Sequence, residues 1–188
     1  MAVSVRAKLW TRDEYDRLVH AGAFAPGAHL QLVQGEIVEM TPQGPAHATA
    51  VRRLQETLGH AFPRGYDVRA QLPLALAGDA MSEPEPDIAV VPGAIGDYRD
   101  HHPTTAVLVV EVADTSVDFD RTRKAEMYAR AGVPEYWVLN IPDQTLEIYR
   151  EPVPEASHYR NRTTLHADDH IVPTMGSSRP ISVAAILP

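Results

Sequence analysis

The sequence predicts an α/β protein with a mixed sheet, and three observations support this prediction. First, segments typical of helices and strands follow one another in the order α-β-β-α-β-β-β-α-β-β. Second, residues 107–110 form a short apolar run rich in β-branched side chains, as in a buried strand. Third, the 188 residues are 44% hydrophobic, which is enough for a real core, so we expect one domain over residues 1–188.

The composition narrows the classes of protein that the chain can belong to. The absence of cysteine excludes a disulfide framework and a thiolate site, and it fits a reducing cytoplasm. No segment resembles a signal peptide, and no apolar run approaches the ~20 residues of a membrane span. We therefore expect a cytoplasmic protein with no membrane partner. The net charge of −8 argues against binding nucleic acid through bulk electrostatics.

The first part of the chain predicts two helices that enclose a hairpin. Residues 11–23 read as a helix because Thr11 and Glu14 form a capping box and a glycine ends the segment. Strands over residues 30–33 and 36–40 meet at a tight Gln-Gly turn. A loop rich in Pro and Gly then leads to a helix over residues 46–62, whose apolar residues recur at helical spacing.

Strands dominate the prediction for the rest of the chain. A strand over residues 67–76 contains Pro73 and is therefore an edge or bulged strand. The other predicted strands are 87–91, 107–110, 136–139 and 145–149. Residues 151–188 show only a weak pattern of short strands and prolines.

The helix predicted over residues 120–131 places a lysine on its apolar side. At ~100° per residue, Arg123 lies on the solvent face, whereas Lys124 lies between Met127 and Tyr128. Two interpretations remain open. Lys124 either pairs with a carboxylate on the sheet, for which Glu111 is the candidate, or extends past its apolar neighbours to water.

Two carboxylates at strand ends predict where a metal ion would bind. Glu111 closes an apolar run, and an ionised carboxylate buried there must be paired, protonated or bound to a metal. Asp87 opens another strand. If these two strands are antiparallel neighbours, the carboxylates share one end of the sheet, and Mg²⁺ typically takes one or two protein carboxylates. Glu36 is a third acid at the start of a strand, so the parts of a metal-assisted phosphodiesterase are present.

Each of these residues also has a plainer interpretation. Asp87 fits a turn cap after Pro86, Glu111 and Lys124 fit a structural ion pair, and Glu36 fits an ordinary strand-edge glutamate. His47 follows the Pro- and Gly-rich loop. It either contacts phosphate or tunes the site, or it is a solvated side chain.

Four separate blocks of the sequence resemble the Uma2 family. The blocks are residues 35–47, residues 82–91, residues 110–116, and Asp120 with Lys124 and residues 128–138. The family is assigned to the PD-(D/E)xK class, so the resemblance implies a restriction-endonuclease-like fold with a central mixed β-sheet flanked by helices. It extends from about Trp10 to Arg150 and more faintly to the end.

The resemblance also implies roles for individual residues. Asp87 would be the aspartate of the PD element and Glu111 the acid of the (D/E)xK element. Both would hold Mg²⁺, with Mn²⁺ able to substitute and the Val112 carbonyl as a third ligand. The basic pattern places its lysine at position 113, where this chain has Ala113, and in the family that lysine lies on the following helix, which matches Lys124. Glu36 would match an additional N-terminal acid, and His47 would be accessory.

The combined expectation is a Mg²⁺-dependent endonuclease that acts on DNA, with a homodimer allowed by analogy with the class. Asp87, Glu111, Glu36 and Lys124 would be its catalytic residues, Lys124 orienting the attacking water and stabilising the developing charge. A rival is a module that binds nucleic acid or protein and keeps the fold without catalysis, as the net charge favours. A third expectation is a hydrolase of small phosphoesters.

Overall fold

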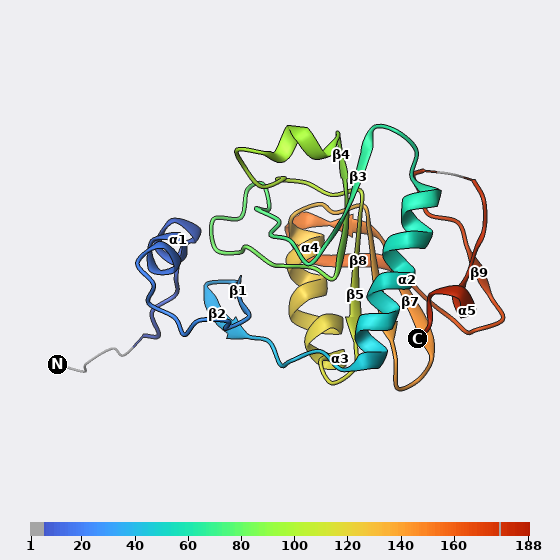
Figure 1. The fold of residues 1–188 in the computed structure, drawn as a ribbon, viewed down its shortest axis with the longest axis horizontal. Helices are drawn as coiled ribbons and strands as arrows, with labels where there is room; N and C mark the ends of the chain where they lie inside the picture. Colours follow the sequence, from blue (N-terminus) through green and yellow to red (C-terminus); the bar gives the residue numbers. More distant parts are fainter. Residues whose placement is uncertain (1–5, 177) are drawn as a thin grey trace.

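The computed structural model describes residues 6–176 and 178–188 and confirms the α/β class, with a central mixed sheet flanked by helices (Figure 1). The sheet has six strands in the order β3-β4-β5-β6-β7-β8. They are β3 (Tyr66–Ala70), β4 (Ile88–Pro92), β5 (Leu108–Ala113), β6 (Glu135–Asn140), β7 (Thr145–Val153) and β8 (His158–Leu165). Strands β5 and β6 are parallel, and the other neighbouring pairs in this sheet are antiparallel.

The parallel pair β5–β6 needs a crossover, which contains the helix predicted over residues 120–131. The helical segment begins earlier than predicted, as α3 (Val117–Phe119), widens into the π-helical turn η2 (Asp120–Lys124) and ends as α4 (Ala125–Arg130). In the π turn, the Ala125 N–H donates to the Asp120 carbonyl. Such turns are often found at functional sites.

Helix α2 (Pro45–Ala61) covers one face of the sheet (Figure 1). Its apolar residues recur at helical spacing and are buried against alternate residues of the strands, as the period of two in a strand requires. The fully buried members of this core include Leu54, Leu58, Ile88, Val110 and Trp137. The predicted helix over residues 46–62 is therefore confirmed.

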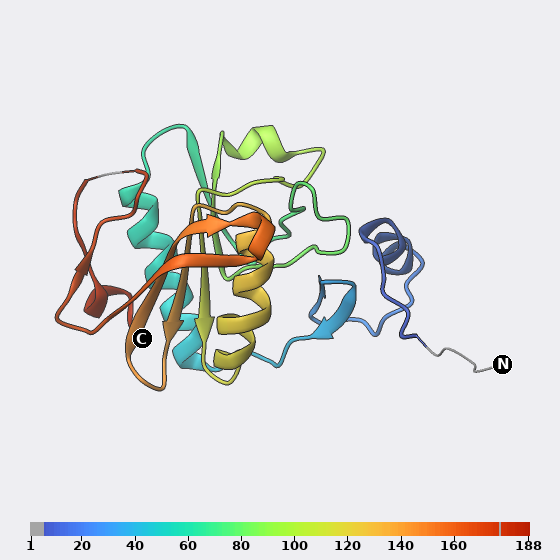
Figure 2. The same ribbon diagram turned by 180° about the vertical axis from the view of Figure 1, so that it is seen from behind.

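Helix α4 covers the opposite face, as the reverse view shows (Figure 2). Met127 and Tyr128 face the sheet and are fully buried, as the helical projection predicts. They pack with Val109, Tyr136 and Val138. Residues with odd numbers on β5 face this second core, and Glu111 is one of them.

The N-terminal part lies beside the sheet rather than within it (Figure 1). Helix α1 (Arg12–His20) has the predicted capping box, and β1 (Leu30–Val33) pairs antiparallel with β2 (Glu36–Glu39). Positive φ values at Gln34 and Gly35 fit the predicted tight turn. A Cβ at Gly35 would lie 2.8 Å from side-chain atoms of Leu9 and Met81, so glycine is required there.

Two predictions about strands need correction. The strand predicted over residues 67–76 ends at Ala70, because Gln71 takes a positive φ of 54° and turns the chain away before Pro73. The long strand β8 was not predicted. Its sequence is polar and it is mostly exposed, so the alternating apolar pattern that marks a strand is weak.

Short elements complete the fold. They are η1 (Ile95–Tyr98), η3 (Pro154–Ala156), the β9 (His170–Ile171) and β10 (Ile181–Ser182) pair, and α5 (Val183–Ile186). Over the described residues, none of the helices combines the length and the apolar character that crossing a membrane requires.

Candidate active site

Asp87 and Glu111 are brought together by the pairing of β4 with β5. The two strands are antiparallel, with Ile88 opposite Val110. Asp87 directly precedes β4, so the register places it across from the segment that holds Glu111. Glu111 lies inside β5 rather than at its end, because the strand continues to Ala113. The predicted antiparallel arrangement is nevertheless present.

The Asp87 carboxylate accepts several hydrogen bonds. Its Oδ2 receives the Val112 N–H at 2.8 Å and lies 3.2 Å from His47 Nε2, while Gln71 Nε2 donates to Oδ1 at 3.2 Å. Burial alone would raise the pKa of Asp87, but the hydrogen bond and charge of His47 outweigh it, so the pKa is lowered. Asp87 is therefore an ionised carboxylate held in a fixed orientation.

Glu111 has fewer donors and a different charge state. Lys124 Nζ lies 2.8 Å from its Oε2, and the Tyr128 hydroxyl donates to Oε1 at 2.7 Å. Burial raises the pKa of Glu111 to about 7, because the opposing effect of Lys124 is offset by the charges of Asp120 and Asp87. The ion pair predicted for Lys124 is present, and the alternative in which its ammonium reaches water is wrong, since the lysine is 1% exposed.

The π turn adds a third carboxylate near the lysine. Asp120 Oδ1 lies 3.6 Å from Lys124 Nζ, and Ser116 Oγ donates to Asp120 Oδ2 at 2.5 Å. The Tyr136 hydroxyl donates to the Asp120 carbonyl at 3.0 Å. Burial raises the pKa of Asp120 despite the nearby lysine. The pKa of Lys124 is raised as well, because the charges of Glu111 and Asp120 outweigh its burial.

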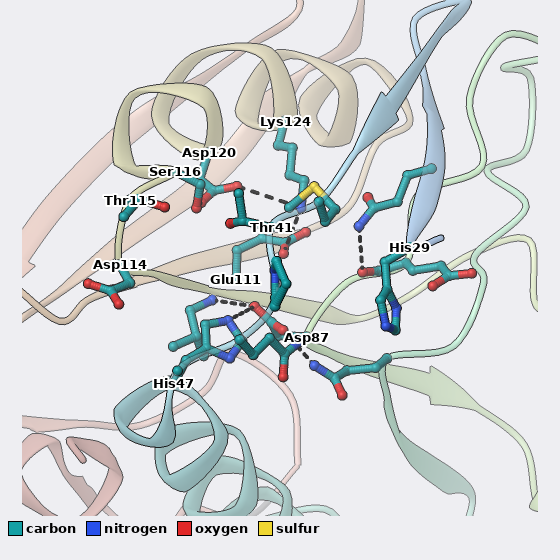
Figure 3. Close-up of a pocket in the computed structure, with 18 residues that line it drawn as sticks. His29, Thr41, His47, Asp87, Glu111, Asp114, Thr115, Ser116, Asp120 and Lys124 are labelled. Atoms are coloured by element: carbon teal, nitrogen blue, oxygen red, sulfur yellow. Dashed lines mark hydrogen bonds and ion pairs between the residues drawn. The ribbon is translucent and has the colours of Figure 1, made fainter. Parts of the chain in front are cut away.

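These groups line a cavity of about 660 Å³ (Figure 3). His47 and Asp87 lie together, while Lys124 projects toward Glu111 from the helical segment. The wall also includes the loop between β2 and α2 and the segment between β5 and α3. The lining residues are His29, Gln31, Met40, Thr41, Pro42, Gln43, Gly44, His47, Gln71, Glu85, Asp87, Glu111, Val112, Asp114, Thr115, Ser116, Asp120 and Lys124.

The donor set fits Mg²⁺ better than a soft metal. Asp87, Glu111 and Asp120 place three carboxyls beside the Lys124 ammonium and the His47 ring, so when ionised they carry an excess of negative charge that a divalent cation would offset. Over the described residues, no three His, Cys, Asp or Glu side chains are grouped to hold a metal. Mg²⁺ is satisfied by one or two carboxylates because it keeps several waters. A site of two carboxylates therefore suits this ion.

Most of the predicted site residues lie together, but Glu36 does not. Asp87, Glu111, Val112, Lys124 and His47 all line the cavity. The Glu36 carboxylate is 53% exposed, does not line the cavity and pairs with Arg123 at 2.7 Å. Its role as an accessory acid stays a prediction.

The His47 side chain is 12% exposed and lies beside Asp87, so the alternative of a solvated histidine is wrong. Burial lowers the pKa of His47, but the hydrogen bond and charge of Asp87 outweigh it and raise the pKa overall. A contribution in the same direction comes from the Val112 carbonyl. The Val112 N–H therefore donates to Asp87, and the Val112 carbonyl lies near His47. Both main-chain groups of Val112 are thus held at the site.

Sequence reasoning missed three residues of this site. Gln71 hydrogen-bonds Asp87 from a left-handed backbone position that no motif marks. Tyr128 lies in the core on the apolar side of its helix, as expected, but the hydrogen bond from its hydroxyl to Glu111 was not predicted. Asp120 was noted in a block that resembles the family but was not counted as a site residue, although its spacing of four residues from Lys124 was a usable signal.

Several arginines that a nucleic acid would need are already paired with acids. Arg121 contacts Glu147, Arg123 contacts Glu36, and Arg130 contacts Asp79. Arg69 lies 3.5 Å from Asp67. These contacts reduce the positive charge that the surface offers to phosphate.

The fold and the site together define a class of protein. The mixed six-stranded sheet flanked by helices is the restriction-endonuclease-like fold that the sequence predicts, and Asp87, Glu111 and Lys124 line one cavity at this sheet. The chain belongs to the Uma2 family, whose model matches residues 12–182 and is described as "Putative restriction endonuclease".

A solved structure agrees with this assignment at the level of the fold. It is described as "a putative nuclease belonging to DUF820 from Anabaena variabilis ATCC 29413". It superposes with a TM-score of 0.74 at 17% identity, covering 94% of this chain and 96% of its own. A comparison with curated proteins finds no match.

Proposed function

We propose that this chain is a Mg²⁺-dependent endonuclease that hydrolyses DNA phosphodiester bonds. The observation that carries the proposal is the presence of Asp87, Glu111 and Lys124 in one cavity. A buried ion pair stabilises a fold less well than apolar packing, so a buried Lys124–Glu111 pair at a cavity favours a functional role. The family and the fold of the Anabaena protein support a nuclease.

In this proposal Asp87 and Glu111 hold the ion, with the Val112 carbonyl as a third ligand. Mn²⁺ would substitute because it takes the same oxygen ligands. When bound, the ion polarises a phosphoryl oxygen and lowers the pKa of a bound water. Gln71 and His47 fix the Asp87 carboxylate in its orientation from two sides. Loss of either side chain would misplace the Asp87 carboxylate, which is a proposed ligand of the ion.

Lys124 acts as a charged donor rather than as a base. Its raised pKa keeps the ammonium protonated at neutral pH, so it donates hydrogen bonds and stabilises negative charge. It orients the attacking water and stabilises the charge that develops on the phosphoryl oxygens. Glu36 pairs with Arg123, the neighbour of Lys124, and does not line the cavity, so an accessory role for Glu36 would be exerted from beside the site.

DNA is the proposed substrate, and the surface offers few cations to its phosphates. The net charge of −8 and the paired arginines leave few contacts to phosphate. We therefore expect weak binding to extended duplex. The cavity itself is acidic, and the bound cation would offset that charge where the scissile phosphate lies.

A cleavage assay on supercoiled plasmid and on a single-stranded circle tests the proposal, with Mg²⁺, Mn²⁺ or EDTA. The variants are Asp87→Asn and Lys124→Met. Asp67→Asn is the matched control, because Asp67 pairs with Arg69 and does not line the cavity. We expect metal-dependent nicking by the wild type and the control, and a loss of about a hundredfold or more in both site variants. Nicking that survives in both site variants would contradict the proposal.

One observation favours a second candidate, the binding module without catalysis. Glu111 already has two hydrogen-bond partners, Lys124 and Tyr128, so a metal must compete for it. The absence of nicking by a wild-type protein that still binds Mn²⁺ in calorimetry would support this candidate.

A further inference from the structure

Lys124 lies between two buried carboxylates, Glu111 and Asp120, and its ammonium is closer to the first. Glu111 is 2% exposed and Asp120 is 1% exposed, so neither can turn to solvent without a change in the structure. Lys124 Nζ lies 2.8 Å from Glu111 Oε2 but 3.6 Å from Asp120 Oδ1. The second distance exceeds a charge-assisted hydrogen bond by about 0.8 Å. The ammonium therefore sits closer to Glu111.

Asp120 is left with one unused acceptor that points to this lysine. Its Oδ1 is buried and accepts no hydrogen bond among the described residues. Its Oδ2 is held by Ser116, and its main-chain carbonyl accepts from Tyr136 and from the Ala125 N–H of the π turn. A buried acceptor without a donor is costly, so this oxygen would be better satisfied with the ammonium nearer to it.

A cation on Glu111 would change which carboxylate the lysine prefers. Glu111 Oε2 faces the ammonium, so a divalent cation on this carboxylate would repel Lys124 at short range. Tyr128 holds Oε1, which keeps the Glu111 side chain in place while the lysine moves. The lysine is long and flexible, whereas Asp120 is fixed by Ser116 and by the turn.

We propose that Asp120 is a positioning residue that receives the Lys124 ammonium when Glu111 binds a divalent cation. Lys124 then pairs with Asp120, and Glu111 becomes free to coordinate. Asp120 lowers the cost of separating the Lys124–Glu111 pair, and it keeps the ammonium within the site. This inference rests on the proposed metal-dependent function.

A double-mutant cycle on metal affinity tests the exchange. Mn²⁺ binding is measured by calorimetry for the wild type, Asp120→Asn, Lys124→Met and the double variant. Asp120→Asn should weaken Mn²⁺ binding about tenfold in the wild type but less than about threefold when residue 124 is methionine, because no ammonium then needs a new partner. Lys124→Met alone should strengthen binding, since Glu111 loses its competitor.

Asp114→Asn is the control for the loss of one negative charge. Asp114 lines the same cavity and is exposed, and Figure 3 shows it apart from Lys124. Its substitution should have the same small effect in both backgrounds.

The outcomes separate this inference from the proposed function. An equal effect of Asp120→Asn in both backgrounds, with Mn²⁺ still bound, would overturn the exchange while leaving the metal site intact. Wild-type protein that binds no Mn²⁺, or binds it equally well after Asp87→Asn, would overturn both. Circular dichroism melts of every variant show whether a loss of affinity arises from unfolding.

Discussion

Two buried glutamates, Glu111 and Glu147, lie on the same face of the sheet and differ in the donors that surround them. In the strand register, Val138 lies opposite Glu111 on one side and opposite Glu147 on the other. Glu111 is 2% exposed and Glu147 is 1% exposed. The same π turn supplies a cation to each, Lys124 to Glu111 and Arg121 to Glu147. Position and burial are thus matched, and only the donors differ.

Glu147 is fully satisfied. Arg121 donates to its Oε1, with Nε at 2.8 Å, while Arg162 and the Tyr149 hydroxyl each donate to Oε2 at 2.8 Å. Burial would raise the pKa of Glu147, but the hydrogen bonds from Arg121 and Tyr149 outweigh it and the pKa is lowered. Two cations serve one acid here, so this cluster leaves nothing for a ligand to bind.

Glu111 has one cation that it shares with Asp120, and Asp87 lies nearby. The outcome is a pKa raised to about 7 by burial and by these neighbouring acids. The contrast teaches that burial of a carboxylate does not identify a site. The informative feature is an excess of acids over cations beside a cavity, because only then does a divalent cation improve the electrostatics.

The largest expected difference between the two glutamates is in metal affinity. Glu111→Gln should weaken Mn²⁺ binding by about a hundredfold or more, since it removes a proposed ligand, whereas Glu147→Gln should change it less than about threefold. Calorimetry on both variants measures this. A similar loss in the two variants would show that the comparison has no bearing on metal binding.

The two cations should also differ in their effect on stability. Arg121→Met leaves Glu147 ionised and short of donors, and we expect a loss of about 2–3 kcal/mol at pH 7. Lys124→Met should cost less, because Glu111 with a pKa of about 7 can take up a proton instead. Urea unfolding in EDTA gives both values. A larger loss for Lys124→Met would mean that Glu111 cannot be protonated in place.

Sequence alone separated these two regions only in part. The helical projection placed Lys124 toward the sheet and made Glu111 its candidate partner, with extension of the lysine to water as the alternative, because both residues stand out in apolar segments. Glu147 stands in a similar setting between Leu146 and Ile148, and nothing local told the two glutamates apart. The distinction depends on Arg162 from β8, a strand that the sequence did not predict.

The limits of the prediction have physical causes. The sequence predicted that Asp87 and Glu111 would lie close together if their two strands were antiparallel neighbours, because each acid stands at the end of an apolar segment. The left-handed Gln71 and the π turn at Asp120–Lys124 were not, because both are set by packing around them rather than by local propensity. Glu36 matched a family pattern, but its partner Arg123 lies 87 residues away.

The pH dependence of stability should have opposite signs at the two glutamates. The raised pKa of Glu111 contributes stability that is present below the unfolded value of 4.5 and is lost as the pH rises through about 7. The lowered pKa of Glu147 contributes stability that is present above 4.5 and is lost as the pH falls below it.

Urea unfolding in EDTA between about pH 3 and about pH 8 checks these signs. For each group, the free energy of unfolding should change by up to about 1.4 kcal/mol per pH unit. Glu111→Gln should flatten the fall in stability between pH 4.5 and about 7, and Glu147→Gln should flatten the fall in acid. His47 also has a raised pKa, so the difference between wild type and Glu111→Gln is the quantity to compare. Identical profiles for wild type and Glu111→Gln would show that Glu111 does not titrate in this range.

The smallest expected effects are at the two tyrosines that donate to these acids. Tyr149→Phe removes one of several donors from Glu147, and we expect a loss of stability of about 1 kcal/mol with no change in metal affinity.

Tyr128→Phe removes the donor to Glu111 Oε1, which frees that oxygen for a proton and raises the pKa of Glu111 further above its usual range. Mn²⁺ binding at pH 7 should then weaken about threefold, because more of the protein must lose a proton first. The loss should disappear at pH 9, roughly two units above the Glu111 pKa of about 7, and a loss that persists there would instead assign Tyr128 to holding the carboxylate in its coordinating orientation.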